Sequence, residues 1–189
     1  MEIVVAKMDD RITIYDTEKK VYEKFIRTNY KKQLRVMIGL RKNHGENAYY
    51  MSNLLRKNEI NTFEVVSYTK NSYVTKEIIG ENLFEKIIKI KNDRETIEKY
   101  IDKYMNIIKK ILELKIYYTD FRLGNFIINS KNELYIIDID EMYDSWYYGV
   151  FKKKRIITKL KRTLKREFSS LRKYGIDFNE NEIYKKYIK

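Results

Sequence analysis

Hydrophobic and polar residues alternate along the first eighty positions in short runs rich in β-branched and aromatic side chains. A period of two is typical of half-buried strands, and polar turns separate the runs. The pattern predicts five strands, over residues 2–7, 11–15, 21–26, 61–68 and 72–79. Because tight turns join most of them, we expect one five-stranded antiparallel sheet that is complete before Gly80.

Helical periodicity is found once within this region and dominates after it. A helix is predicted from about 45 to 57, and Gly80-Glu81-Asn82 marks a hinge before a helical start at Leu83–Ile90. The clearest helix spans Asn92 to Leu114, where Asn92 and Glu95 resemble a capping box. Its apolar residues recur four and three apart, at Ile97, Ile101, Tyr104, Ile108 and Ile111. Further helices are predicted over 152–173 and 180–189, and residues 28–43 as a basic loop with a short helix.

The stretch from Tyr117 to Asp140 contains the candidate chemistry. Two apolar runs, 126–128 and 134–137, flank a turn-prone Asn-Ser-Lys-Asn and predict a β-hairpin. An antiparallel pair brings its outer residues side by side, so we expect Asn125 and Asp138 at the same end. Asp120, on the preceding loop, can face both. A carboxylate aimed at a hydroxyl, beside an amide and a second carboxylate on Mg²⁺, is the apparatus of phosphoryl transfer.

This stretch also carries a resemblance. Asp120 and Asn125, followed by Asp138 after an apolar run, resemble the catalytic loop and metal-binding Asp of the protein-kinase-like fold. The segments TDFRLGNFIIN and IIDID are most similar to the lipopolysaccharide core kinases, which phosphorylate heptose or Kdo sugars. The resemblance implies an α+β, two-lobed fold that uses ATP and Mg²⁺. A small five-stranded antiparallel N-lobe would span 1–79, and a reduced, mainly helical C-lobe 80–189.

The resemblance also implies roles at the reacting end of the site. Asp120 would accept or orient the proton of the attacking hydroxyl, and Arg122 would face the transferred phosphate with its guanidinium fork. Asn125 and Asp138 would hold Mg²⁺. Asp140 is either an additional metal ligand or a group that supports the ligands.

Four further positions would bind the nucleotide in the same comparison. Lys24, on the third strand, would pair with the α- and β-phosphates, and Glu46, about twenty residues later, would hold Lys24 in position. The backbone of Glu77 and Ile79 would contact adenine. Two alternatives stay open: Lys24 as an ordinary surface lysine, and Glu46 as an acid favoured by a helix N-terminus.

Three departures from the kinase pattern change what is expected. The connection between the first two strands, Met8-Asp9-Asp10, has no Gly where kinases lay a Gly-rich loop over the phosphates. Tyr118 stands where kinases usually carry His. Residues 144–149 match a motif that follows the activation segment of protein kinases, yet they begin six residues after Asp138. Little chain remains to hold a polypeptide substrate, which argues against a conventional protein kinase.

Composition favours an anionic partner and allows a reducing compartment. The 189 residues include 40 Lys and Arg against 27 Asp and Glu, a net charge of +13, and no Cys. A chain rich in Lys, Ile, Asn and Tyr is also the product of AT-rich coding sequence, so the charge does not identify the partner. The start is not typical of a signal peptide, and no run approaches the length of a membrane span. We therefore expect a cytoplasmic protein.

These patterns lead to one function and three alternatives. We expect an ATP- and Mg²⁺-dependent kinase that phosphorylates a sugar hydroxyl of lipopolysaccharide core. Its substrate would be a glycolipid or sugar. Helix 152–173 would bury its apolar face in the C-lobe, and its cationic face could in addition contact the anionic inner face of the membrane. The alternatives are an atypical Ser/Thr kinase of the RIO kind, a catalytically inactive kinase-like protein, and a basic nucleic-acid-binding protein. No recognisable nucleic-acid module is present, so no specific nucleic acid is predicted.

Overall fold

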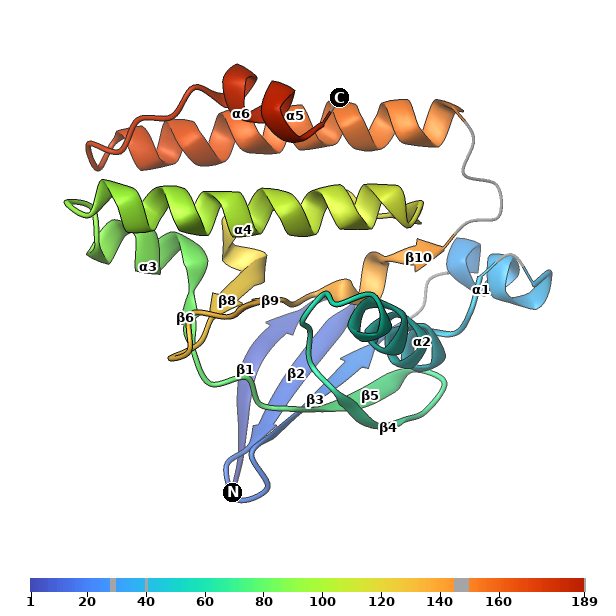
Figure 1. Cartoon of the computed structure of the whole chain (residues 1–189). Helices are drawn as coiled ribbons and strands as arrows, with labels where there is room; N and C mark the ends of the chain where they lie inside the picture. The colour runs from blue at the N-terminus through green and yellow to red at the C-terminus, as the bar shows by residue number, and fades with distance from the viewer. Residues whose placement is uncertain (28–29, 40, 145–149, 189) are drawn as a thin grey trace. The chain divides into compact units, whose positions relative to one another are not determined.

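The structure is a computed structural model that describes residues 1–27, 30–39, 41–144 and 150–188. The chain forms two compact units (Figure 1). The first contains Met1–Ile78 together with Asp138–Glu141, and the second contains Ile79–Ile137 and Met142–Lys189. The short segment 138–141 therefore packs with the first unit, although both of its sequence neighbours belong to the second.

The first unit is built on a five-stranded sheet. Its strands are β1 (Glu2–Met8), β2 (Arg11–Asp16), β3 (Val21–Ile26), β4 (Val65–Tyr68) and β5 (Ser72–Lys76). They lie in the order β1-β2-β3-β5-β4, and every neighbouring pair is antiparallel. The predicted α+β class with a five-stranded antiparallel sheet is confirmed. Thr13 pairs with Lys24, and Lys24 pairs with Tyr73. Because directly paired residues share a face, these three side chains lie on one side of the sheet.

Helix α2 (His44–Lys57) packs against β4 and β5 in this unit, and α1 (Tyr30–Met37) precedes it. The backbone of α2 approaches the β4–β5 turn so closely at Gly45 that a Cβ there would collide with the carbonyl oxygens of Thr69 and Ser72. Only glycine fits this contact, which fixes the first turn of the helix against the sheet. A 3-10 turn, η2 (Ile139–Glu141), completes the unit and contacts α2.

The second unit is mainly helical. Its helices are α3 (Leu83–Lys89), α4 (Arg94–Glu113), α5 (Val150–Arg172) and α6 (Glu180–Tyr187). The predicted hairpin is present as β8 (Phe126–Ile128) and β9 (Leu134–Ile136), and β6 (Glu81–Asn82) pairs with β8. A second small ladder joins β7 (Ile116–Tyr117) to β10 (Tyr143–Asp144), and a 3-10 turn, η1 (Leu123–Asn125), leads into β8.

The apolar stripes predicted for the two long helices are buried. The five residues named for α4 are at most 2% exposed, and so are Leu160, Leu164, Phe168 and Leu171 of the stripe predicted for α5. Ile157, predicted as the first residue of that stripe, is only partly buried, and Ile156 is buried in its place. The predicted capping pair of α4 is wrong. Asp93, not Asn92, is the N-cap, and its side chain accepts a hydrogen bond from the Thr96 N–H at 3.0 Å. Both side chains can cap a helix, so the sequence alone did not decide between adjacent positions.

Candidate active site

Lys24 and Asp138 form an ion pair in the first unit. The Nζ atom of Lys24, on β3, lies 2.6 Å from Oδ1 of Asp138 and also contacts Oδ2 of Asp140. The Lys24 side chain is only 15% exposed. Burial lowers the pKa of Lys24, but the charges of Asp140 and Asp138 outweigh that effect and leave its pKa above the ordinary value. The ammonium group therefore stays charged next to the predicted metal ligand.

The turn that carries the two carboxylates is held from several sides. Asp138 has a φ of 58°, in the left-handed region that non-glycine residues seldom adopt. Asp140 follows in η2 with a side chain that is 2% exposed. Its Oδ1 accepts a hydrogen bond from the Tyr73 hydroxyl, and its backbone carbonyl accepts one from Asn47 Nδ2 at 3.4 Å. An unusual backbone conformation that its surroundings hold in place is typical of functional turns.

Arg11 is a third charged member of this cluster, and the sequence analysis missed it. Its Nη1 atom lies 3.9 Å from Asp138 Oδ1 and 4.0 Å from Asp140 Oδ2. Burial lowers the pKa of Arg11, and the carboxylates of Asp138 and Asp140 raise it further than burial lowers it. The sequence did contain a signal for this position. Residues two apart on a strand share a face, and Arg11 lies two residues before Thr13, the partner of Lys24.

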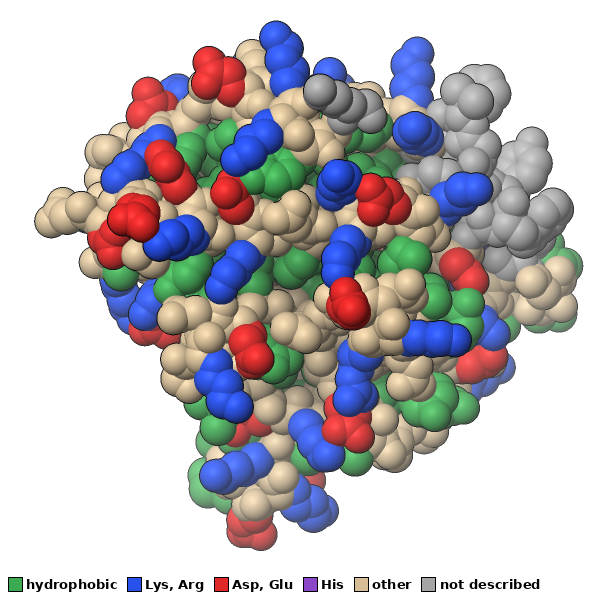
Figure 2. Space-filling view, viewed as in Figure 1, with side chains coloured by type: hydrophobic (Ala, Val, Ile, Leu, Met, Phe, Trp, Pro, Cys, Tyr) green, Lys and Arg blue, Asp and Glu red, His purple; other side chains and the backbone are tan. Residues whose placement is uncertain are grey.

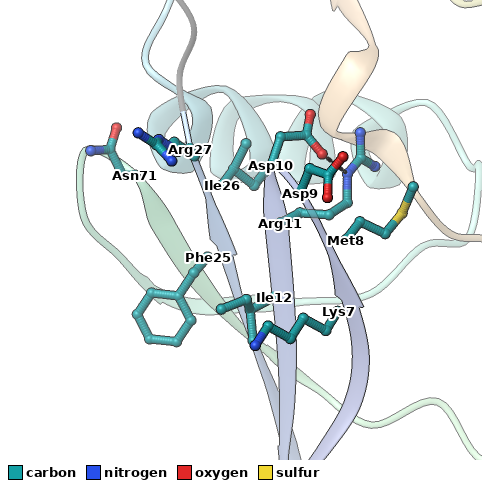
Figure 3. A pocket seen from close by; sticks show the side chains of 10 residues that line it. All are labelled: Lys7, Met8, Asp9, Asp10, Arg11, Ile12, Phe25, Ile26, Arg27 and Asn71. Carbon is teal, nitrogen blue, oxygen red and sulfur yellow. Dashed lines mark hydrogen bonds and ion pairs between the residues drawn. The ribbon is translucent and has the colours of Figure 1, made fainter.

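The glycine-free connection between β1 and β2 is partly neutralised by the same arginine. The Arg11 Nε donates to Asp10 Oδ1 at 3.4 Å, and the Arg27 N–H donates to the Asp10 carbonyl at 2.7 Å. Figure 3 shows Asp9, Asp10 and Arg11 at this end of the sheet, around a hollow of about 540 Å³. Ile12 and Phe25 also line it, and they alternate along their strands with the residues that share the face of Lys24. The hollow therefore shares Arg11 with the Lys24 cluster, while Ile12 and Phe25 lie on the other face of the sheet from Lys24.

Glu46 does not contact Lys24 in this structure. It lies in the first turn of α2, is 42% exposed, and pairs with Lys42 at 3.2 Å. The acids that contact Lys24 come instead from the segment 138–141. The predicted contact between Glu46 and Lys24 is thus replaced by contacts with Asp138 and Asp140.

Glu77 and Ile79 lie in the irregular segment where the two units meet in the sequence. The Glu77 N–H donates to the Lys20 carbonyl at 3.0 Å, and its side chain accepts from the Tyr15 hydroxyl at 3.0 Å. Ile79 is 74% exposed. Among the hydrogen bonds within the described part of the chain, none uses its backbone.

Asp120 and Arg122 form a two-pronged ion pair in the second unit. Arg122 Nε and Nη2 each lie 2.7 Å from one carboxylate oxygen of Asp120. The loop beneath them is anchored to the helices. The Tyr104 hydroxyl donates to the Phe121 carbonyl at 2.5 Å, and the Leu123 N–H donates to Glu167 Oε2 at 3.1 Å. The carboxylate and guanidinium are thus partly exposed on a backbone that α4 and α5 hold in place.

Asn125 is oriented by the same loop. Its Nδ2 donates to the Asp120 carbonyl at 2.9 Å and to the Tyr118 hydroxyl at 3.3 Å, and the residue is only 8% exposed. Because the nitrogen is committed, Oδ1 is the atom that can bind a cation. Tyr118, in place of the usual histidine, is buried and packs edge-on against Phe121, with 4.9 Å between the ring centroids. It also accepts the Asn125 hydrogen bond, which the sequence did not indicate.

The hairpin register places Asn125 opposite the residue before Asp138. The Ile137 N–H donates to the Asn125 carbonyl at 2.9 Å, which extends the β8–β9 ladder by one step. The amide oxygen of Asn125 and the carboxylate of Asp138 are hard oxygen ligands of the kind that Mg²⁺ prefers. By their chemistry, both residues therefore fit this ion. Residues 145–149, which include most of the motif that follows Asp138, lie outside the described residues.

A five-stranded antiparallel sheet with a lysine on its third strand, followed by a mainly helical unit, is the arrangement of the protein-kinase-like fold. Solved structures agree. The Rio2 kinase–ADP/Mg²⁺–phosphoaspartate complex from Chaetomium thermophilum matches with a TM-score of 0.56 and 13% identity, over 95% of this chain and 59% of that chain. WbdD, co-crystallised with the kinase inhibitor LY294002, matches with a TM-score of 0.50 and 13% identity, over 86% of this chain and 37% of that one.

Identity this low shows the fold alone, and the chain spans little more than half of the first of these proteins and about a third of the second. Comparison of the sequence with protein-family models and with curated proteins finds no match.

Proposed function

We propose that this protein is a small ATP- and Mg²⁺-dependent kinase that transfers a phosphoryl group to a hydroxyl. The observation that carries the proposal is the 2.6 Å pair between Lys24 and Asp138. Phosphoryl transfer requires a cation for the phosphates beside a carboxylate for the metal, and two residues far apart in the sequence meet in that arrangement. If the hairpin were only structural and its acids were solvated, a largely buried lysine in contact with them would not be expected.

Each residue then has a defined task. Asn125 and Asp138 would hold Mg²⁺, which would supply a positive charge that neutralises the phosphate oxygens. Lys24 binds the α- and β-phosphates, while the Glu77 carbonyl and the Ile79 backbone contact adenine. Asp120 accepts the proton of the acceptor hydroxyl. Arg122 has five N–H donors, so it can orient Asp120 with two of them and present others to the transferred phosphate.

The acceptor we propose is a sugar hydroxyl of lipopolysaccharide core, of the heptose or Kdo type. Two observations support a small acceptor over a polypeptide. The local sequence around Asp120 and Asp138 resembles the core kinases, and only five residues separate β10 from α5. The second candidate is an atypical Ser/Thr kinase of the RIO kind. It is favoured by the structural match to Rio2 over 95% of the chain, although that match concerns the fold.

The surface of α5 supports a membrane-facing substrate. Its exposed side contains Lys154, Arg155, Lys159, Lys161, Arg162, Lys165 and Arg166. Glu167 is the only acid of the helix, and it is turned inward, where it accepts the Leu123 N–H. On the face seen in Figure 2 basic and acidic side chains are interspersed, including along the upper margin. We propose that this side of α5 contacts the anionic inner face of the membrane, where a glycolipid acceptor is anchored.

No helix of the described residues is both long and apolar enough to pass through a bilayer. We propose that the contact is peripheral, with the rest of the protein in the cytoplasm.

Nucleotide binding tests the proposal directly. We expect MgATP to raise the Tm of the wild-type protein, and Asp138→Asn to abolish that shift. Glu64→Gln is the matched control, because Glu64 is an acid of the same unit that pairs with Lys76 away from the cluster. A folded wild-type protein whose Tm does not respond to MgATP, or an Asp138→Asn variant that responds as the wild type does, would contradict it. The first result would favour the inactive kinase-like alternative.

A further inference from the structure

The orientation of α2 decides which acid can hold Lys24. The buried residues of this helix are His44, Gly45, Asn47, Ala48, Met51, Ser52 and Leu55. At about 100° per residue, Glu46 lies about 180° from the centre of that buried arc. Its carboxylate is directed away from the sheet, toward Lys42. A contact with Lys24 would require the helix to turn about its axis until Glu46 took the direction of Asn47, a rotation of about 100°.

Such a rotation is opposed by the start of the helix. Gly45 lies against the carbonyl oxygens of Thr69 and Ser72 with no room for a side chain, so turning α2 would drive the Cβ of a neighbouring residue into this backbone. The residue of α2 that does face the segment 138–141 is Asn47, which is 3% exposed and donates to the Asp140 carbonyl. A neutral amide therefore occupies the side of the helix from which a carboxylate would have to reach Lys24.

Asp140 supplies the missing carboxylate. One of its oxygens contacts the Lys24 ammonium, and the other accepts the Tyr73 hydroxyl from the neighbouring strand β5. Tyr73 pairs directly with Lys24 across the sheet, so the same two strands hold both ends of the interaction. Asp140 is much more deeply buried than Asp138, whose side chain is 28% exposed. A buried carboxylate held by a hydroxyl and by its own backbone provides a fixed position.

We infer that Asp140, and not Glu46, is the residue that positions Lys24 for the nucleotide. The inference rests on the proposed function. With Asp138 engaged by Mg²⁺, Lys24 would still have the Asp140 carboxylate beside it, which would keep its ammonium directed at the phosphates. The carboxylate that contacts Lys24 therefore comes from the turn after β9, and not from helix α2. Asp140 is thus a positioning residue that acts through Lys24, and it needs no contact with the metal.

Two activity-independent measurements test the pairing. Acetylation of Lys24 by an amine-reactive reagent, followed by mass spectrometry, reports how well its ammonium is protected. We expect Asp140→Asn to accelerate acetylation of Lys24 by about tenfold, equivalent to about 1.4 kcal/mol, and Glu46→Gln to leave it unchanged within about twofold, a difference of about 0.4 kcal/mol. We also expect Lys24→Met to restore most of the Tm lost in Asp140→Asn, because removing both partners leaves no buried charge unpaired. The rescue keeps the test valid if Asp140→Asn alone folds poorly.

The third measurement is kinetic. Asp140→Asn should raise the KM for ATP by about tenfold, a loss of about 1.4 kcal/mol, with a smaller change in kcat, whereas Glu46→Gln should change neither. If Glu46→Gln reproduces the effects of Asp140→Asn, or if Asp140→Asn leaves Lys24 protected and the KM unaltered, the inference is wrong. A wild-type protein that binds no MgATP refutes the proposed function, and with it the nucleotide role of Asp140. Acetylation and Tm then still decide whether Asp140 holds Lys24.

Discussion

Lys24 Nζ lies 2.6 Å from Asp138 Oδ1, although 114 positions separate the two residues in the sequence. The contact joins the third strand of the sheet to the turn that follows the hairpin, and Arg11 and Asp140 complete a cluster of two cations and two carboxylates. The two positive and two negative groups balance one another, so each charge of the cluster has a partner of opposite sign.

Removal of the Lys24 charge is expected to weaken nucleotide use specifically. Lys24→Met should lower kcat/KM for ATP by about 10²-fold, since a cation on the phosphates contributes about 2–3 kcal/mol when charge-assisted bonds are lost. Steady-state kinetics at varied ATP measure this. Lys76→Met is the matched control, because Lys76 is an exposed lysine of the neighbouring strand that pairs with Glu64. Equal losses in the two variants would show that Lys24 has no special role.

Catalytic activity is expected to require both the Asp120 carboxylate and the Arg122 guanidinium, which form the two-pronged ion pair. Asp120→Asn should reduce kcat by about 10²- to 10⁴-fold, the usual range for loss of a proton acceptor, with little change in MgATP binding. Arg122→Lys should recover little of the activity lost in Arg122→Ala, because an ammonium cannot form two parallel bonds to one carboxylate. Single-turnover rates and ATP titrations separate these effects. Full activity in Arg122→Lys would mean that only the charge matters.

Tyr104 gives stability a defined dependence on alkaline pH. Burial, and then the charge of Glu167, raise the pKa of Tyr104 well above its ordinary value of 10.0. The unfolded chain therefore loses this proton first, so the stabilisation is complete below pH 10 and declines as the pH rises above it. The slope is about 1.4 kcal/mol per pH unit for one proton.

The phenylalanine variant isolates this contribution. Tyr104→Phe should be less stable than wild type by about 1 kcal/mol at pH 8, because the hydrogen bond to Phe121 is lost. The difference should shrink or reverse at pH 11. Urea unfolding at the two pH values measures it, and a constant difference between the variants would show that Tyr104 does not titrate in this way.

Charge reversal on α5 tests the membrane contact. Changing Arg155, Lys159 and Arg162 to Glu should reduce binding to vesicles containing anionic phosphatidylglycerol by more than about 100-fold, at about 1 kcal/mol for each base removed. Binding should also fall as the salt concentration rises. The control carries the same change at Lys91, Lys109 and Lys115, three exposed residues of the same unit. Vesicle sedimentation measures both, and an equal effect of the two triple variants would point to net charge alone.

The sequence predicted the sheet, the long helices and the hairpin because each depends on a local period. The face of α2 that Glu46 occupies could not be predicted in the same way. It depends on Gly45 fitting against a turn more than twenty residues later, and moving a residue by one position along a helix changes its direction by about 100°. The same limit explains why the sequence did not decide whether Asp140 is a metal ligand or a group that supports the ligands. Its surroundings include Tyr73 and Asn47, which come from other elements.

Phosphate transfer from labelled ATP tests the central claim most directly. The purified protein is incubated with [γ-³²P]ATP and Mg²⁺ in parallel with lipopolysaccharide core oligosaccharide, protein and RNA acceptors. We predict label in the oligosaccharide, dependent on Mg²⁺ and abolished in Asp120→Ala. Label in protein alone, again lost in Asp120→Ala, would replace the sugar acceptor with the RIO-like alternative. Transfer to no acceptor by a folded protein, or transfer that survives Asp120→Ala, would contradict the proposed active site.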